Sequence, residues 1–187
     1  MVHGSFDWPI QGMNLLTAMR FYGLTLSLQE ASASTIEVHD DDPETFQGMM
    51  EFFYSNSMDS RFRLKGKDCR IYSNSIPNVL LPLIHLHALA DKYDAKALQE
   101  ATSNSAEEIT KSYPYELTAK DAELMIKAHY PFCTSVMGDM GQVITKFILR
   151  KESALMRTNA FDNFVHVYAN FGADLYFSCK QGGLLRV

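Results

Sequence analysis

The sequence predicts an α+β fold that is mostly α-helical, with a small β-sheet and a helical extension at the C-terminus. Apolar residues recur at helical spacing in most segments after residue 42. Residues 35–38 alternate in polarity and contain β-branched side chains, which predicts a short strand. The composition is typical of a folded domain, because 47% of the 187 residues are hydrophobic and 21% are charged.

A further pair of short strands is predicted in the polar connection that follows the first long helix. Residues 62–64 and 70–72 form a loose hairpin around Gly66 in this interpretation. Together with residues 35–38, they supply the small sheet of the predicted fold.

The first long helix is predicted over residues 43–54. Asp42 is a suitable N-cap, because its carboxylate accepts from the free N–H groups of the first turn, and Pro43 fits the first helical position. The apolar residues that follow at i, i+3, i+4 and i+7 predict the buried face: Phe46, Met49, Met50 and Phe53.

Two more helices are predicted before the extension. Pro77 opens one of them, and its buried face is expected to hold Val79, Leu83, Leu86, Ala90 and Tyr93. The next begins after Asp94, and its face is expected to hold Leu98, Ala101, Ser105 and Ile109. The side chains on the face of this later helix are small and in places polar, which favours close packing against the preceding helix.

Residues 112–114 are the predicted linker, because Pro114 disfavours helix in the residue before it. The domain boundaries are therefore placed at 1–112 and 113–187. In the second part, Thr118 and Asp121 form a capping arrangement that begins a helix. Two further helices are predicted over residues 140–148 and 161–171, the last with an interruption near Gly172.

The formal net charge of −5 argues against binding to a phosphate backbone. Residues 1–112 carry 9 basic and 15 acidic side chains (9 − 15 = −6), and residues 113–187 carry 8 and 7 (8 − 7 = +1). One local basic run interrupts the acidic part: Arg61, Arg63, Lys65, Lys67 and Arg70. We interpret it as a solvated loop, with contact to an acidic partner or RNA as the alternative.

The cysteines and the absence of sorting signals indicate an intracellular protein, cytoplasmic or nuclear. Cys69, Cys133 and Cys179 are few and widely spaced, which fits reduced thiols better than disulfides or a zinc site. Neither a signal peptide nor an apolar stretch long enough to span a bilayer is visible in the sequence.

Three groups of residues invite a catalytic or metal-binding interpretation, and in each a structural role is favoured. The run Asp40-Asp41-Asp42 lacks the remaining ligands of a calcium loop and is explained by helix capping. His85 and His87 lie two positions apart, so they do not share a helix face as metal ligands would.

Cys133 with His129 has a spacing compatible with a nucleophile–base pair, but Pro131 lies between them and no oxyanion motif accompanies them. A buried structural cysteine is the favoured interpretation. No glycine-rich nucleotide motif occurs in the sequence. The sequence thus predicts no enzyme activity, no metal site and no cofactor.

Two segments resemble the BTB/POZ family. Residues 35–55 (TIEVHDDDPETFQGMMEFFYS) are similar to its strand, acidic turn and following helix, where the pattern is I-x-L, D-D-x-P and F-x-x-M-L-x-F-I-Y-T. Residues 88–98 (ALADKYDAKAL) are similar to its A-x-x-A-D-K-Y-x-x-x-x-L. The resemblance covers about residues 25–112, and the added helices are similar to those of fungal BTB-domain proteins.

The resemblance implies a BTB/POZ-like domain over 1–112 and a helical extension over 113–187. It departs from the family at the start, where only Val2 and His3 match the opening V-H-K segment and Pro9 stands where the first helix runs. The usual opening strands are thus expected to be missing, which leaves the usual homodimer interface incomplete.

BTB/POZ domains are protein–protein interaction modules, and many serve as substrate adaptors for cullin-based ubiquitin ligases. The cullin-binding motif of the family, a hydrophobic residue, any residue and Glu, matches Leu28-Gln29-Glu30. The resemblance therefore implies Leu28 and Glu30 as partner-binding residues and a cullin scaffold as a candidate partner. A self-associating scaffold or transcription-complex component without a cullin is the alternative, and neither nucleic acid nor membrane is an expected partner.

Overall fold

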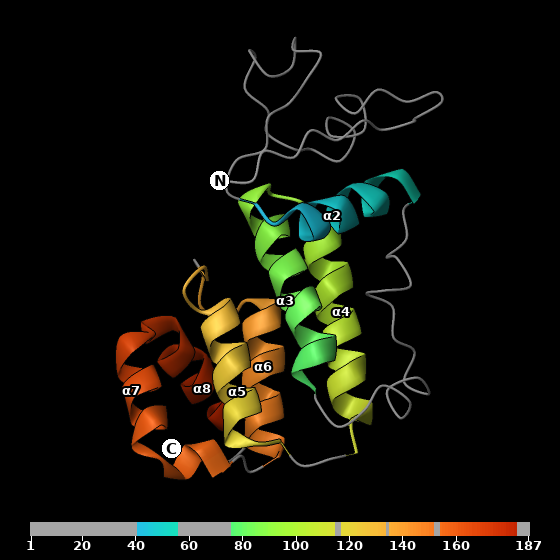
Figure 1. Cartoon of the computed structure of the whole chain (residues 1–187). Coiled ribbons are helices and arrows are strands. Elements are labelled where there is room, and N and C mark those ends of the chain that lie inside the picture. The colour runs from blue at the N-terminus through green and yellow to red at the C-terminus, as the bar shows by residue number, and fades with distance from the viewer. Residues whose placement is uncertain (1–40, 56–75, 115–116, 134, 152–153, 183–187) are drawn as a thin grey trace.

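The computed structural model describes residues 41–55, 76–114, 117–133, 135–151 and 154–182, and these contain helices and no strand. Figure 1 shows their order along the chain: α2 (Pro43–Ser55), α3 (Pro77–Lys92), α4 (Lys96–Ser112), α5 (Ala119–His129), α6 (Asp139–Arg150), η3 (Ala154–Arg157), α7 (Asn159–Val167) and α8 (Ala169–Gln181).

The prediction of an α+β fold is wrong, because the described part of the protein is all-α. Its helices bury their apolar faces against other helices, and no sheet is needed to cover them. The segments that suggested strands, residues 35–38 and 62–72, lie outside the described residues, as do Leu28 and Glu30.

The start of α2 confirms the predicted cap. The backbone N–H and the hydroxyl of Thr45 both donate to Asp42 Oδ2, at 2.8 and 2.7 Å. These hydrogen bonds lower the pKa of Asp42, and the one from the Thr45 hydroxyl has the largest effect. The predicted buried face is also confirmed: Phe46, Met49, Met50 and Phe53.

Helices α3 and α4 are joined by a tight turn. Asp94 has a φ of 53°, the left-handed region that Asp tolerates better than most residues, and Ala95 N–H donates to the Ala90 carbonyl at 2.8 Å. The buried face of α4 differs from the predicted one, since Thr102 and Ala106 are buried while Ala101 and Ser105 are only partly so.

In the second half of the chain, Thr118 caps α5 as predicted, because its hydroxyl accepts from Asp121 N–H at 3.1 Å. The predicted interruption near Gly172 is displaced, since the chain leaves helical geometry at Tyr168, which has φ −107° and ψ 87°. Gly172 instead lies inside α8, so the run predicted as one interrupted helix is two helices, α7 and α8.

The helices form a layered array (Figure 1). α3 packs against α4 and α5, and α6 packs against both α4 and α5, so these four helices surround one core. α2 lies across one end of the α3–α4 pair, while α8 packs on α6 and α7 on α8. The helices before and after residue 113 therefore share buried contacts, and Tyr113 itself packs edge-on against Phe147.

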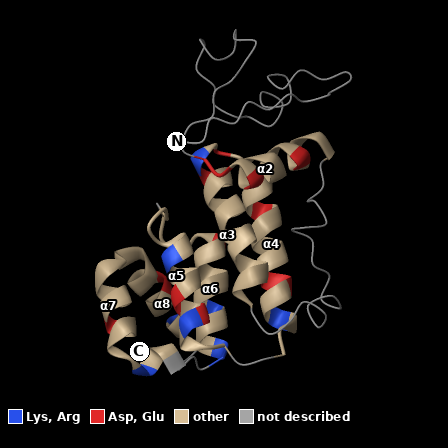
Figure 2. Ribbon diagram, viewed as in Figure 1, with Lys and Arg blue, Asp and Glu red and all other residues tan. Residues whose placement is uncertain are grey.

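None of the helices in the described residues is both long and apolar enough to cross a membrane. Charged residues are distributed along the helix surfaces in Figure 2, and basic residues gather toward the C-terminal ends of α4 and α6. This basic region contrasts with the net charge of −5 of the whole chain.

Candidate interaction surfaces

Asp41, just before α2, is held by two residues at the end of α3. Its Oδ1 accepts from Lys92 Nζ at 2.7 Å, and its Oδ2 accepts from the Tyr93 hydroxyl at 2.8 Å. We call this set the Asp41 junction. The Asp41 side chain is only 7% exposed, whereas the Lys92 side chain is 50% exposed, so the hydrogen bond from Tyr93 is the better shielded of the two interactions.

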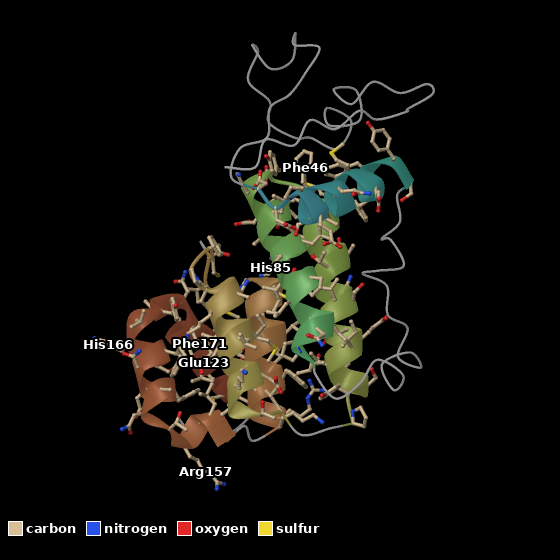
Figure 3. The ribbon with its side chains drawn as sticks, viewed as in Figure 1. Phe46, His85, Glu123, Arg157, His166 and Phe171 are labelled. Carbon is tan, nitrogen blue, oxygen red and sulfur yellow. The ribbon has the colours of Figure 1, made fainter. Side chains whose placement is uncertain are left out.

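The Asp41 junction is reinforced by ring contacts. Phe46 packs edge-on against Tyr93 with ring centroids 6.0 Å apart, and Lys92 Nζ lies 5.5 Å from the Tyr93 ring centroid. Figure 3 shows Phe46 where α2 meets the end of α3. The acidic turn and the A-D-K-Y segment, separate in the sequence, thus form one structural unit.

A second surface is apolar and lies in the connection between α5 and α6. Phe132 is 68% exposed, Val136 42% and Met137 36%. We call these three residues the apolar loop. Val167, at the end of α7, is also exposed. Large exposed apolar side chains that share one connection are typical of surfaces that bind proteins.

The apolar loop is anchored by α8. Asp174 Oδ1 accepts from the backbone N–H of Met137 at 2.5 Å, and Asn170 Nδ2 donates to the Cys133 carbonyl at 2.9 Å. Met137 has a φ of 62°, a conformation that a non-glycine residue adopts only when its surroundings require it. These contacts hold the loop backbone in place while its apolar side chains remain exposed.

Asp174 is fully buried and also binds the end of α5. Its Oδ2 accepts from the Tyr130 hydroxyl at 3.1 Å, and that hydroxyl lies 3.3 Å from the Gly141 carbonyl. Burial raises the pKa of Asp174, and the hydrogen bonds from Met137 and Tyr130 oppose this rise. Burial beside this carboxylate also raises the pKa of Tyr130.

A buried histidine contact joins α3 to α5. The rings of His87 and His129 lie edge-on with centroids 6.0 Å apart, and His129 Nε2 is buried without a hydrogen-bond partner in the structure. Burial, followed by the neighbouring His87, lowers the pKa of His129 to about 3. Both rings are therefore neutral at pH 7, and His129 packs within the core while His87 is half-buried beside it.

The sequence-derived metal and nucleophile candidates do not assemble into a site. His85 is exposed while His87 is half-buried, as their spacing predicts. Cys133 Sγ donates to the Ser135 carbonyl at 3.0 Å, and burial raises the pKa of the thiol, the opposite of activation. Among the described residues, no three His, Cys, Asp or Glu side chains are grouped as metal ligands.

Sequence reasoning missed Asp174 and the apolar loop. Asp174 lies on the buried face of α8 with Phe171 and Ser178, at helical spacing from both. A lone carboxylate within such a face is a usable signal of a buried polar contact. The exposure of Phe132 carries no comparable signal, because it depends on how the connection folds back on α8.

Leu28, Glu30 and the basic run at 61–70 fall outside the described residues, so their predicted roles stay predictions. No family model, no curated protein and no solved structure matches this chain.

Proposed function

We propose that this chain is a protein–protein interaction module of BTB/POZ type without catalytic activity. The observation that carries the proposal is the Asp41 junction, since it joins the two segments on which the resemblance rests. Lys92 and Tyr93 of the A-D-K-Y segment both bind the acidic turn that precedes α2. Because the two segments contact each other in the fold, there is a physical reason for both to occur in one chain.

The finer proposal is that the module is a substrate adaptor for a cullin-based ubiquitin ligase. Leu28 and Glu30 are the residues proposed to contact the cullin, by their match to the family motif. An apolar side chain beside a carboxylate is suitable interface chemistry, because the first is desolvated and the second sets orientation.

The test is a pull-down of a cullin N-terminal domain by the full chain and by Glu30→Lys. We expect the wild type to retain the cullin and the variant to lose about tenfold in affinity, as reversal of an interfacial charge does. Glu100→Lys is the matched control, because Glu100 is an exposed residue of α4 and the charge change is the same. Failure of the wild type to bind would exclude the adaptor function.

The alternative is a self-associating module that acts without a cullin. The apolar loop is the observation that favours it, because Phe132 at 68% exposure is covered when two copies associate through this surface. The anchoring of the loop by Asp174 lowers the conformational cost of such an association.

Size-exclusion chromatography with light scattering tests the alternative. We expect a dimer for the wild type and a monomer for Phe132→Ser. Val167→Ser is the control for a general loss of apolar surface, because Val167 is exposed but lies outside the apolar loop. A wild-type chain that stays monomeric at high concentration rules out self-association.

A further inference from the structure

His87 and His129 bring two imidazole rings together from helices that are separate in the sequence. His87 lies in α3, His129 is the last residue of α5, and their ring centroids are 6.0 Å apart. Two imidazoles that bind one transition-metal ion at about 2.1 Å per nitrogen place their ring centroids about 5 to 6.5 Å apart. The observed separation therefore fits two rings that share one ion.

The inner ring of the pair has a nitrogen that the fold leaves unsatisfied. His129 is 5% exposed, and its Nε2 has no hydrogen-bond partner among the described residues. A buried polar atom in this state is unfavourable, and a ligand removes the cost. Burial lowers the pKa of His129, so the ring is neutral at pH 7 and has a lone pair for a metal ion.

The charged groups around His87 favour a cation. Burial lowers the pKa of His87, the carboxylates of Asp91 and Asp139 raise it, and the charge of Lys96 lowers it. Asp91 lies one helical turn after His87 on the same face of α3, and Asp139 begins α6. Lys96 is exposed and pairs with Asp94 at 2.8 Å, so its charge is partly compensated. Two carboxylates therefore outweigh one ammonium group beside the rings.

The ligand set selects a kind of metal. Imidazole nitrogens suit zinc and its neighbours in the first transition series, whereas Mg²⁺ and Ca²⁺ prefer oxygen ligands. Within the described residues no three His, Cys, Asp or Glu side chains are grouped as ligands, so the pair supplies two positions and water supplies the others. Binding is therefore expected to be weaker than in a structural zinc site with four protein ligands.

We propose that His87 and His129 form a two-histidine site for a divalent transition-metal ion such as Zn²⁺, which joins α3 to α5. The half-buried His87 forms the solvent side of the site, and His129 forms its inner side. The site is separate from the Asp41 junction and the apolar loop, and it does not depend on the BTB/POZ assignment. It adds a ligand to a module whose proposed function includes none.

Isothermal titration calorimetry of the full chain with ZnCl₂, after treatment with EDTA, tests this proposal. We expect saturable binding that His87→Gln and His129→Phe each weaken by about tenfold or more, because each removes one of two protein ligands. An excess of MgCl₂ is expected to leave the Zn²⁺ affinity unchanged. No binding by the wild type, unchanged affinity in either variant, or displacement of Zn²⁺ by Mg²⁺ overturns the proposal.

The matched control is His85→Gln, the same substitution in the same helix at an exposed position (Figure 3). His166→Gln, at an exposed position of α7, is a second control. We expect both controls to bind Zn²⁺ as the wild type does. An equal loss in the controls and in the site variants would reveal adventitious binding to surface histidines only, which overturns the proposal.

Thermal unfolding gives an independent measurement, because an ion that binds the folded state raises the unfolding midpoint. ZnCl₂ is expected to raise the midpoint of the wild type and of His85→Gln and to leave that of His87→Gln unchanged. An equal rise in all three contradicts the proposal. Circular dichroism checks that the helices persist in each variant. If His129→Phe does not fold, His87→Gln, a change at a half-buried position, carries the test.

Discussion

The hydroxyl of Tyr93 donates a 2.8 Å hydrogen bond to Asp41 Oδ2, although 52 positions separate the two residues. The bond closes a loop that begins before α2 and ends after α3, and Lys92 binds the other oxygen of the same carboxylate. A single acidic side chain thereby sets how the start of α2 meets the end of α3. The acidic turn thus has two roles, because Asp42 caps α2 while Asp41 binds α3.

Removing the Asp41 carboxylate is expected to destabilise the protein. Asp41→Ala deletes both hydrogen bonds and is expected to lower the free energy of unfolding by about 2 kcal/mol, and Tyr93→Phe by about 1 kcal/mol. Urea denaturation measures both. Lys96→Ala removes an exposed pair with Asp94 and is expected to leave the midpoint unchanged. Equal effects of all three variants would contradict a special role for the junction.

Gly141 is expected to tolerate no side chain. A methyl group on its Cα would overlap with the Asp174 carboxylate, which is itself fixed by Met137 and Tyr130. Gly141→Ala is therefore expected to lower the free energy of unfolding by about 2 kcal/mol or more. Gly138→Ala is the control, because its nearest neighbour is the Ser135 hydroxyl, an exposed group that can turn away. Thermal unfolding of both variants decides the point.

Asp174 is expected to be replaceable by Asn but not by Ala. Asp174→Ala leaves the Met137 N–H and the Tyr130 hydroxyl without this partner and is expected to cost about 3 kcal/mol. Asp174→Asn keeps an acceptor for Met137 and offers an N–H to the Tyr130 oxygen, whose proton then turns to the Gly141 carbonyl. Asp174→Asn is therefore expected to lower the free energy of unfolding by less than Asp174→Ala does. Chemical denaturation of the two variants measures the difference.

The His87–His129 contact predicts a loss of stability in acid. The folded-state pKa of His129 is about 3, against the ordinary histidine pKa of 6.5, so between these values the unfolded chain binds a proton that the folded chain does not. Stability is therefore complete above pH 6.5 and falls as the pH drops from 6.5 toward 3, by up to about 1.4 kcal/mol per pH unit from this residue.

The charged groups around this contact act mainly on His87. Burial, the largest effect, lowers the pKa of His87, and the charge of Lys96 lowers it further, while Asp91 and Asp139 raise it. His129→Phe is expected to flatten the dependence of the denaturation midpoint on pH between 6.5 and 4. His85→Gln, a change at an exposed position of the same helix, serves as control. An unaltered pH profile in His129→Phe would show that other groups cause the acid sensitivity.

Several local structures were predictable because they depend on neighbouring residues. The Asp42 and Thr118 caps follow from side chains that reach N–H groups three residues away, and the structure contains both. The buried face of α2 follows from helical spacing in the same way. The end of α4 at Ser112 agrees with the effect of Pro114 on the backbone before it.

The incorrect predictions concern features that distant residues determine. The expected sheet is absent from the described residues, where helices cover one another. The chain bends at Tyr168 rather than at Gly172, because α8 packs on α6 while α7 packs on η3 and α8. Glycine marks where a break is easy, but tertiary packing decides where one occurs.

By itself, the sequence determined the helices, two of their caps and the two segments that resemble the BTB/POZ family, since these depend on residues within a few positions of each other. Only the tertiary structure decided that Asp41 meets Tyr93, that Asp174 anchors the apolar loop, and that His87 meets His129. Each of these relationships joins residues more than thirty positions apart. Their closeness follows from the packing of whole helices, which local spacing does not specify.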